Sequence, residues 1–306
     1  MPSKNELELF YKKINSLLDQ QSYEIPFKEF SAKSLKLANK GRYGKITREF
    51  GRQIQHILKG RVSGVNKFLF VPHVRQFNFA NSNNLKVAVI NKQAKQWYGR
   101  RGAEEAFDFL QENEMGMFRN ARSFLDLGGH QLVWAIFYAK LPDTRRVVTF
   151  EPSHLNALIG LFNCLINEVT DLVDLEPHAV IASNSTDSPS MLVDFMTTPM
   201  TFRKLSGESF DFVKVDIEGY EFELLQCPVF INTLRNAASA HLELHLGHRH
   251  KEGISPIDWI RRLDFLSLPV VEMKTQTDYR TFLESCDPQG FHAFLIQRQS
   301  GIGERT

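Results

Sequence analysis

From Gly102 onward, short apolar segments alternate with longer amphipathic ones, and this alternation leaves few folds open to the chain. The short segments have the length and the Val, Ile and Phe content of strands, whereas the longer ones repeat apolar residues at helical spacing. Such alternation predicts an α/β fold, in which helices cover both faces of a mostly parallel sheet. We expect strands at 123–127, 146–150, 179–182, 210–215, 238–245, 269–274 and 291–297, and helices at 103–113, 130–140, 153–167, 220–226 and 257–265.

The first 91 residues follow another pattern. Apolar residues at intervals of three and four predict helices, and two segments rich in Val, Phe and Ile, separated by four polar residues, predict a β-hairpin. We therefore expect an accessory or lid unit at 1–91 and a main domain at 92–300. Within the accessory unit we expect helices at 5–20 and 47–58, and strands at 67–79 and 85–90.

Charge is distributed very unevenly between the two parts of the chain. Residues 1–101 contain 20 Lys and Arg against 6 Asp and Glu, although the net charge of the whole chain is only +2. A basic segment beside an acidic body indicates either an anionic partner or docking of the two parts on each other. The charge pattern does not decide between these two readings.

Composition excludes several classes of protein. The 306 residues include 42% hydrophobic residues, 18 Gly, 12 Pro and 3 Cys, as in ordinary globular domains rather than collagen, low-complexity chains or disulfide scaffolds. The cysteines form no Cys-x-x-Cys pair, so we expect a reducing cytoplasm and neither a disulfide nor a structural zinc. The longest apolar stretch, residues 132–139, is too short to span a bilayer, and the first residues lack a secretory apolar region.

Polar residues follow the first two expected strands of the main domain. After the first strand, Asp126, Gly128, Gly129 and His130 lead into a helix, where glycine allows close backbone approach and N–H groups of the helix start can hold a ligand. After the second strand, Glu151 can accept hydrogen bonds from both hydroxyls of a ribose. A tight turn and a helix-start acid are the alternative readings, but the combination favours a nucleoside-containing ligand.

Three carboxylates follow the strand at 210–215. Asp216, Glu218 and Glu221 surround Gly219, and carboxylates at the mouth of a sheet serve as general bases, metal ligands or acceptors from substrate hydroxyls. A helix-start role explains one of them but hardly all three.

The next strand places His241, Glu243 and His245 on one face. Three polar side chains on one face of a buried strand point to a site rather than to core packing. We expect no metal here, since His-x-Glu-x-His on a strand is less specific than the helical zinc motif. His248 and His250 are expected in a solvated loop.

These blocks resemble the FkbM-type family of S-adenosylmethionine-dependent methyltransferases. The resemblance covers about two thirds of the chain, from Trp97 to Arg298, and its most specific piece is VKVDIEGYE at 213–221. The other pieces are FLDLGG at 124–129, FEPSHLNALIGLFNCLIN at 150–167 and HLELH at 241–245.

The resemblance implies a class I methyltransferase fold, a Rossmann-like seven-stranded sheet whose last strand is antiparallel, and methyl transfer to a hydroxyl oxygen. It implies that Asp126, Gly128, Gly129 and His130 line the methionine and ribose portions of S-adenosylmethionine. In the same way, Glu151 would hold the ribose hydroxyls. Ser183 and Asn184 would lie near the adenine, and Asp216 and Glu218 would face the transferred methyl and the acceptor.

One position departs from the family. Leu132 stands where the family commonly has a third glycine, and its side chain would crowd the first helical turn and reshape the cofactor pocket. A degenerate member that binds or scaffolds without catalysis therefore stays open. We favour activity because Glu151 and the carboxylates are present.

Methyl transfer is an in-line displacement, so holding donor and acceptor aligned supplies much of the rate. If the acceptor is an alcohol on a sugar, glycan or other secondary metabolite, a base assists. We expect Asp216 and His245 to be the acid/base pair, with Glu218 and Glu243 orienting the substrate or the histidine. Tyr98 and Trp97 are candidates to cap the cofactor, although core packing is favoured for Trp97.

Two other classes of protein were weighed. An NAD-dependent oxidoreductase normally needs Gly-x-Gly-x-x-Gly, which Gly128 and Gly129 do not provide. An RNA-modifying enzyme would explain the basic first hundred residues, but no RNA-binding signature occurs. We expect a small-molecule or glycan acceptor, anionic if the basic unit forms a docking surface, and no nucleic-acid partner.

Overall fold

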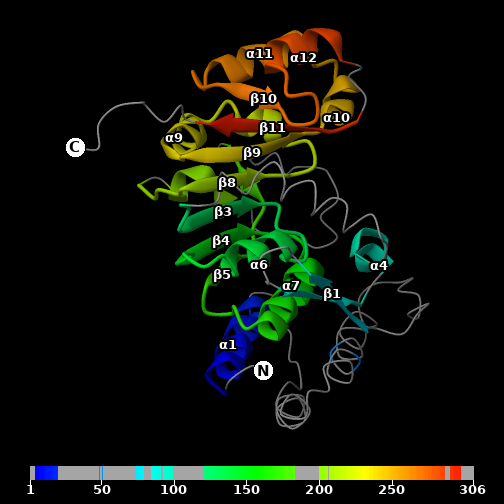
Figure 1. Cartoon of the computed structure of the whole chain (residues 1–306), viewed down its shortest axis with the longest axis vertical. Helices are drawn as coiled ribbons and strands as arrows, with labels where there is room; N and C mark the ends of the chain where they lie inside the picture. Colours follow the sequence, from blue (N-terminus) through cyan, green and yellow to red (C-terminus); the bar gives the residue numbers. More distant parts are fainter. Residues whose placement is uncertain are drawn as a thin grey trace.

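The computed structural model describes residues 4–19, 48, 50, 73–78, 84–90, 92–98, 120–182, 200–205, 207–286 and 290–297. Its centre is a seven-stranded sheet in the order β10-β11-β9-β8-β3-β4-β5. In Figure 1 these strands follow one another from β10 near the top to β5 below. Strands β5, β4, β3, β8 and β9 are parallel to one another, and β11 is antiparallel to both β9 and β10. The strands are β3 (Ser123–Leu127), β4 (Arg146–Phe150), β5 (Val173–Glu176), β8 (Phe212–Val215), β9 (Ser239–Leu244), β10 (Val270–Glu272) and β11 (His292–Gln297).

This sheet confirms the expected fold class. It has seven strands and is mostly parallel, and its last strand along the chain, β11, runs against both neighbours. These are the features that the class I methyltransferase resemblance implies.

The third strand of the sheet is not where we expected it. The sheet edge is β5, at Val173–Glu176, whereas the expected strand at 179–182 contributes only β6 (Val180–Ile181), which pairs with β7 (Met200–Thr201) outside the sheet. The prediction of a sheet strand at 179–182 is therefore wrong. An edge strand is covered on fewer sides, so β5 alternates apolar and acidic residues and gives a weaker apolar signal than Ala-Val-Ile-Ala.

Beyond residue 120, four expected helices of the main domain are present, and three further ones were not expected. Ser153 caps α7 by accepting a hydrogen bond from the Asn156 N–H, and Ser255 with Asp258 forms a capping box at α11. The expected helix at 103–113 lies outside the described residues, as does that at 47–58 except for Arg48 and Phe50, which are helical. Expected were α6 (Val133–Ala139), α7 (His154–Asn167), α8 (Glu221–Leu224) and α11 (Pro256–Asp264); not expected were α9 (Pro228–Asn236), α10 (Leu246–His250), α12 (Tyr279–Ser285) and the 3₁₀ turn η1 (Phe202–Leu205).

The short helix α10 corrects the loop expected around His248 and His250. No described helix has both the length and the apolar character needed to cross a bilayer.

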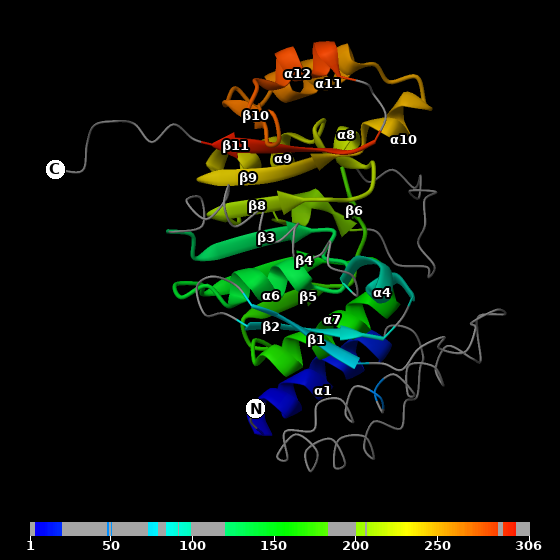
Figure 2. The same ribbon diagram turned by 45° about the vertical axis from the view of Figure 1, so that its right-hand side comes forward.

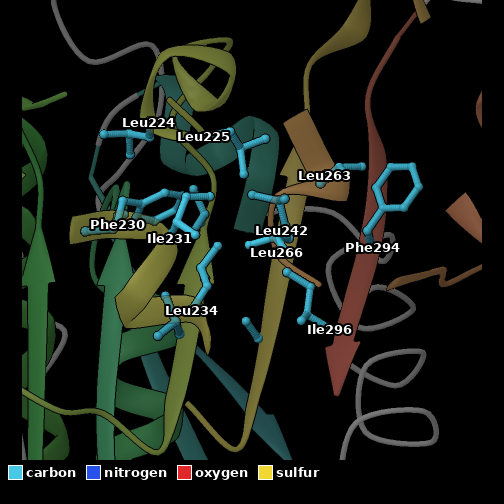
Figure 3. Close-up of a cluster of buried hydrophobic side chains, with 14 of the residues drawn as sticks. Leu224, Leu225, Phe230, Ile231, Leu234, Leu242, Leu263, Leu266, Phe294 and Ile296 are labelled. Atoms are coloured by element: carbon cyan, nitrogen blue, oxygen red, sulfur yellow. The ribbon is translucent and has the colours of Figure 1, made fainter. Parts of the chain in front are cut away.

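A continuous apolar core fixes the half of the sheet that contains β8, β9 and β11. Figure 3 shows side chains of α9 and α11 meeting those of β9 and β11, and every labelled residue is nearly or fully buried. Burial of a Leu, Ile or Phe side chain contributes about 1.5–3 kcal/mol. This packing holds the ends of β8 and β9 in place. The labelled residues are Leu224, Leu225, Phe230, Ile231, Leu234, Leu242, Leu263, Leu266, Phe294 and Ile296.

The described parts of the N-terminal unit pack on the main domain through α7. They comprise α1 (Lys4–Asp19) and the antiparallel hairpin of β1 (His73–Asn78) and β2 (Asn84–Val89), and both confirm the sequence predictions. The helix α4 (Lys92–Tyr98), which was not expected, begins the main domain and packs against β2. Figure 2 shows α1 and the hairpin beside α7.

Two asparagines of α7 hold the backbone of β2. The Oδ1 atom of Asn163 accepts from the Ala88 N–H at 2.8 Å. Asn167 accepts from the Lys86 N–H at 2.8 Å and donates to the Lys86 carbonyl at 2.6 Å. The side chains of α7 thus provide partners that a further strand would otherwise provide.

We expect Asn163→Ala to lower the free energy of unfolding by about 1–3 kcal/mol, because it leaves the buried Ala88 N–H without its acceptor. Urea unfolding measures the change. Asp171→Ala, an exposed turn residue beyond the same helix, is the control and should be neutral. Equal stability of the two variants would contradict docking through Asn163.

Candidate functional site

The strands β3, β4, β8 and β9 end at one edge of the sheet, where α4 and α10 also lie (Figures 1 and 2). Ligands of open α/β sheets bind outside this carboxyl edge. A polar row leads to it through the core, because four paired residues of these strands share one face: Thr149, Asp126, Lys214 and His241. The residues two positions later in each strand continue that face. They are Glu151, Gly128, Asp216 and Glu243, and they lie at the carboxyl edge.

Lys214 is the cation of this polar row. It is 1% exposed, and its Nζ lies 3.1 Å from Asp216 Oδ2 and 3.8 Å from Asp126 Oδ1. Burial lowers the pKa of Lys214, but the two carboxylates outweigh it and raise the pKa above its ordinary value. For Asp216 burial is likewise outweighed, by the charge of Lys214, and the pKa is lowered. The structure thus holds Asp216 as a carboxylate.

Asp126 is the more deeply buried partner of Lys214. Thr149 donates to its Oδ2 at 3.0 Å, while its Oδ1 is buried and receives no hydrogen bond from any residue that the structure describes. Burial raises the Asp126 pKa in spite of the Lys214 charge. A buried acceptor of this kind can accept a hydrogen bond from a donor group of a ligand.

The glycine turn, residues 128–132, joins β3 to α6. Gly128 has φ +85°, and a Cβ there would lie 1.7 Å from the Asp216 carbonyl oxygen, so only glycine lets the ends of β3 and β8 approach this closely. Gly128 and Gly129 both donate their N–H groups to the Phe150 carbonyl, at 3.0 and 2.8 Å. Our expectation of free N–H groups at a helix start is therefore wrong for both glycines. Helix α6 begins only at Val133, after the turn has paired these donors within the chain.

Glu151 follows β4 directly and is tied to the glycine turn. Its two oxygens accept from the His130 N–H at 2.6 Å and from the Ser153 N–H at 2.8 Å. Burial raises the Glu151 pKa to about 8, against the lowering effect of these two hydrogen bonds. The carboxyl keeps acceptor capacity for further donors, as hydrogen bonds from a diol would require.

Leu132 does not occupy the place that its departure from the family pattern predicts. It has φ +58°, is fully buried, and belongs to the apolar cluster around α6. A Cβ on Gly160 of α7 would lie 2.1 Å from the Leu132 Cδ1, so the leucine fills the space beside that glycine. Its side chain serves helix packing.

Tyr98, at the end of α4, contacts the glycine turn. Its hydroxyl lies 2.7 Å from His130 Nδ1. Burial, followed by the charges of Asp216, Glu151 and Asp126, raises the Tyr98 pKa above its ordinary value, so the phenol stays protonated. Burial also lowers the His130 pKa to about 4, which keeps that ring neutral.

The two aromatic residues of α4 differ in their surroundings. The position of Tyr98 fits the predicted cap over the cofactor cleft, although no ligand contact tests that role. Trp97 is 55% exposed, so the core packing favoured for it is wrong. The short helix α4 buries Ala94 and leaves the indole outside.

A carboxylate–histidine cluster stands at the ends of β8 and β9; it consists of Asp216, Glu218, Glu221 and His245. His245 Nδ1 lies 2.9 Å from Glu221 Oε1, while His245 Nε2 lies 3.5 Å from Glu218 Oε2 and 3.8 Å from Asp216 Oδ1. Glu218 has φ +55°, a costly backbone conformation that turns the chain at this point.

The charges around His245 decide its protonation in the chain alone. Burial lowers its pKa, but the Glu221 hydrogen bond and the charges of Asp216 and Glu218 outweigh burial and raise the pKa to about 9. The imidazole therefore carries a proton on both nitrogens at neutral pH, which does not suit a free base. The carboxylates of Asp216 and Glu218 stabilise a positive charge at Nε2.

The remaining predicted residues of β9 lie deeper. His241 is 3% exposed and its Nε2 lies 3.5 Å from Glu243 Oε1. Burial, with the Asp216 charge, raises the Glu243 pKa. Glu243 lies beyond Lys214 on the shared face, and no described contact joins it to His245.

The structure brings most of the predicted site residues to one edge: Asp126, Gly128, Gly129, His130, Glu151, Asp216, Glu218, Glu243 and His245. Ser183 and Asn184 lie outside the described residues. The sequence alone gives Lys214 no role and assigns Glu221 to no particular partner. Lys214 stands two residues before Asp216, so strand alternation alone places both on one face.

No family model matches the chain, and no curated protein matches it. Solved structures similar to the chain include an O-methyltransferase from Bacillus cereus in complex with SAH, at 14% identity over 67% of this chain and 84% of that one, with a TM-score of 0.39. The O-methyltransferase TomG from Streptomyces achromogenes, in complex with SAM, is 15% identical over 67% and 85%, with a TM-score of 0.37. A putative O-methyltransferase from Klebsiella pneumoniae is 12% identical over 93% and 94%, with a TM-score of 0.35. Similarity this low carries no weight for the site, which rests on this chain's own residues.

We expect Leu132→Ala to destabilise the protein by about 2–4 kcal/mol through the cavity it leaves. Because the side chain packs beside Gly160, binding of S-adenosylhomocysteine should not change. Leu263→Ala, another fully buried leucine, is the matched control for lost stability. Tighter binding in Leu132→Ala alone, measured by calorimetry, would show that the leucine obstructs the cleft.

Proposed function

We propose that this chain is an S-adenosylmethionine-dependent methyltransferase that acts on a hydroxyl oxygen of a sugar, glycan or other secondary metabolite. The main support for the proposal is the hydrogen bond from the His130 N–H, in the glycine turn, to the Glu151 carboxylate. A buried acid after the second strand of the parallel set is hydrogen-bonded to the turn after the first, as a ribose site requires. The FkbM-type affiliation is supported by the sequence blocks alone.

The residues of the cleft fit the polar parts of this cofactor. Glu151 would accept from the ribose hydroxyls. Asp126 Oδ1, which lies 3.8 Å from Lys214 Nζ and accepts no hydrogen bond from the described residues, offers a further acceptor. His130 Nε2, on the ring that Tyr98 contacts, is also buried and has no hydrogen-bond partner in the described part of the chain. When bound, S-adenosylmethionine supplies an electrophilic methyl group on a sulfonium.

Asp216 and His245 remain our candidates for handling the acceptor proton, and both face the same small volume. Asp216 is fixed by Lys214 and has one oxygen directed to His245. Glu218, which is 64% exposed at its side chain, lies on the solvent side of the pair and would orient the acceptor. Glu243 would act through Lys214 and His241 on the other side.

The accessory unit would form a docking surface for an anionic acceptor. Tyr98, in the helix α4 that directly follows this unit, lies at the glycine turn, and the chain to residue 101 is strongly basic. We place the enzyme in the cytoplasm, since no disulfide joins Cys164, Cys227 and Cys286, all of which the structure describes.

Glu151→Gln should weaken S-adenosylmethionine binding by about tenfold or more, because a charged acceptor of two hydrogen bonds becomes a neutral group that offers one. Calorimetric titration measures the dissociation constant. Glu176→Gln, an acid near 46% exposed at the end of β5, is the matched control and should bind normally. If the wild type binds no cofactor, or binds NAD instead, the proposed function fails.

Cofactor binding should depend on pH through Glu151. Its pKa of about 8 means that the ligand-free carboxyl is mostly protonated at pH 7, whereas ribose hydroxyls donate to the ionised form. Binding below pH 8 therefore releases a proton, and the dissociation constant should fall up to about tenfold per pH unit until pH 8. Calorimetric titrations in two buffers of different ionisation enthalpy measure how many protons are released on binding. A Glu151→Gln variant with the same pH dependence would exclude this assignment.

Asp216→Asn should reduce turnover by about 10²- to 10⁴-fold and spare cofactor binding, because it removes a proton acceptor but not the ribose site. Production of S-adenosylhomocysteine with a panel of sugar and glycan alcohols measures turnover. Asp174→Asn, on β5, is the control. A normal rate in Asp216→Asn would refute the assignment.

A further inference from the structure

Three side chains of the carboxylate–histidine cluster present one ligand atom each to a common point. Asp216, Glu218 and His245 have oxygen or nitrogen atoms that all lie within 4.8 Å of one another. His245 Nε2 is 3.5 Å from Glu218 Oε2 and 3.8 Å from Asp216 Oδ1. Two ligands that bind a cation at about 2.1 Å are about 3.0 Å apart at octahedral angles and about 3.4 Å apart at tetrahedral angles, so Nε2 and each of these two oxygens need to approach by less than about 1 Å to bind an ion.

A second observation concerns the far side of the histidine. Glu221 is fully buried, and its Oε1 accepts from His245 Nδ1 at 2.9 Å and from the backbone N–H groups of Gly219 and Ile217 at 3.0 and 3.1 Å. A carboxylate can only accept, so Nδ1 carries a hydrogen, and Nε2 is the atom directed to the other two acids. Metal-binding histidines have this arrangement, in which a buried carboxylate fixes the ring nitrogen that is not bound to the metal.

The oxygens of Asp216 are divided between two neighbours. Oδ2 lies 3.1 Å from Lys214 Nζ, whereas Oδ1 faces His245. Lys214 therefore neutralises the cluster from the core side only. Glu218, which is 64% exposed at its side chain, closes it from the solvent side and leaves access for a ligand.

We propose that Asp216, Glu218 and His245 bind a divalent first-row transition cation such as Mn²⁺, with Glu221 as the residue that positions His245. Two carboxylates and one imidazole suit such a cation better than Mg²⁺, which prefers oxygen ligands throughout. Three protein ligands leave open positions on the solvent side. There the cation would hold an oxygen of the acceptor and lower the pKa of its hydroxyl, so in the metal-bound protein Asp216 and His245 would act as ligands rather than as an acid/base pair. This last step alone rests on the proposed methyl transfer.

The test uses the full-length protein after removal of metal with a chelator, in the absence of cofactor. Mn²⁺ is titrated by calorimetry and by the loss of the free Mn²⁺ signal in electron paramagnetic resonance. We expect one site per chain and at least a tenfold weaker affinity in Glu218→Gln. Glu284→Gln, an exposed acid on α12, is the matched control and should bind as the wild type does. No binding by the wild type, or equal affinity in Glu218→Gln, would overturn the proposal.

The positioning role of Glu221 needs a spectroscopic readout. Pulsed electron paramagnetic resonance of bound Mn²⁺ should show hyperfine coupling to an imidazole nitrogen in the wild type. This coupling should disappear in His245→Asn. Glu221→Gln should weaken Mn²⁺ binding by about 10- to 100-fold. Persistence of the nitrogen coupling in His245→Asn would overturn the assignment of His245.

A parallel titration with S-adenosylmethionine separates this proposal from the proposed function. Mn²⁺ binding without cofactor binding would uphold the metal site and overturn the methyltransferase. Cofactor binding without Mn²⁺ binding would overturn the metal site and uphold the methyltransferase.

Discussion

The geometry of the site depends on Lys214, a lysine buried between two acids. An uncompensated charge at this depth is so costly that removing one partner of a buried pair typically destabilises a protein by about 3–5 kcal/mol. Asp126 and Asp216 therefore have to stay on either side of the ammonium group, on neighbouring strands in register. Since one oxygen of Asp216 is held by Lys214, the other is directed to His245, and a core ion pair thus sets the orientation of a surface cluster.

The sequence predicts the sheet and the edge where its chemistry lies, because both follow from periodicity. Alternation along β9 placed His241 and Glu243 on one face, and the acids after each strand were found at one edge, as parallel topology requires. Sequence spacing cannot reveal which acid pairs with which base. Glu221 lay among three similar carboxylates, and only the fold shows that it, and not Asp216, holds the Nδ1 side of His245.

Three other differences between expectation and structure have the same origin. The strand β5 was overlooked because an edge strand needs apolar residues on fewer sides. The N–H groups of Gly128 and Gly129 looked free in the sequence, yet a carbonyl from the neighbouring strand, that of Phe150, accepts both. Leu132 appeared to obstruct the cleft, whereas its partner Gly160 lies 28 positions further on and cannot be inferred from local pattern. Each of these is a contact between distant segments.

The N-terminal unit is connected to the glycine turn through α4, the helix that follows it. Asn163 and Asn167 of α7 hold β2 by its backbone, and the chain continues from that hairpin into α4. This path brings Tyr98 to His130, at the glycine turn. The docking of the hairpin and the position of Tyr98 at the glycine turn are therefore connected through a few hydrogen bonds.

The central claim is that the space beside Glu151 and the glycine turn holds an adenosyl group. The most direct test is a crystal structure of the protein with S-adenosylhomocysteine. The account predicts both ribose hydroxyls within hydrogen-bond distance of the Glu151 carboxylate, with the thioether sulfur on the side of Asp216. A nucleoside bound elsewhere, or a ribose that does not contact Glu151, would contradict it.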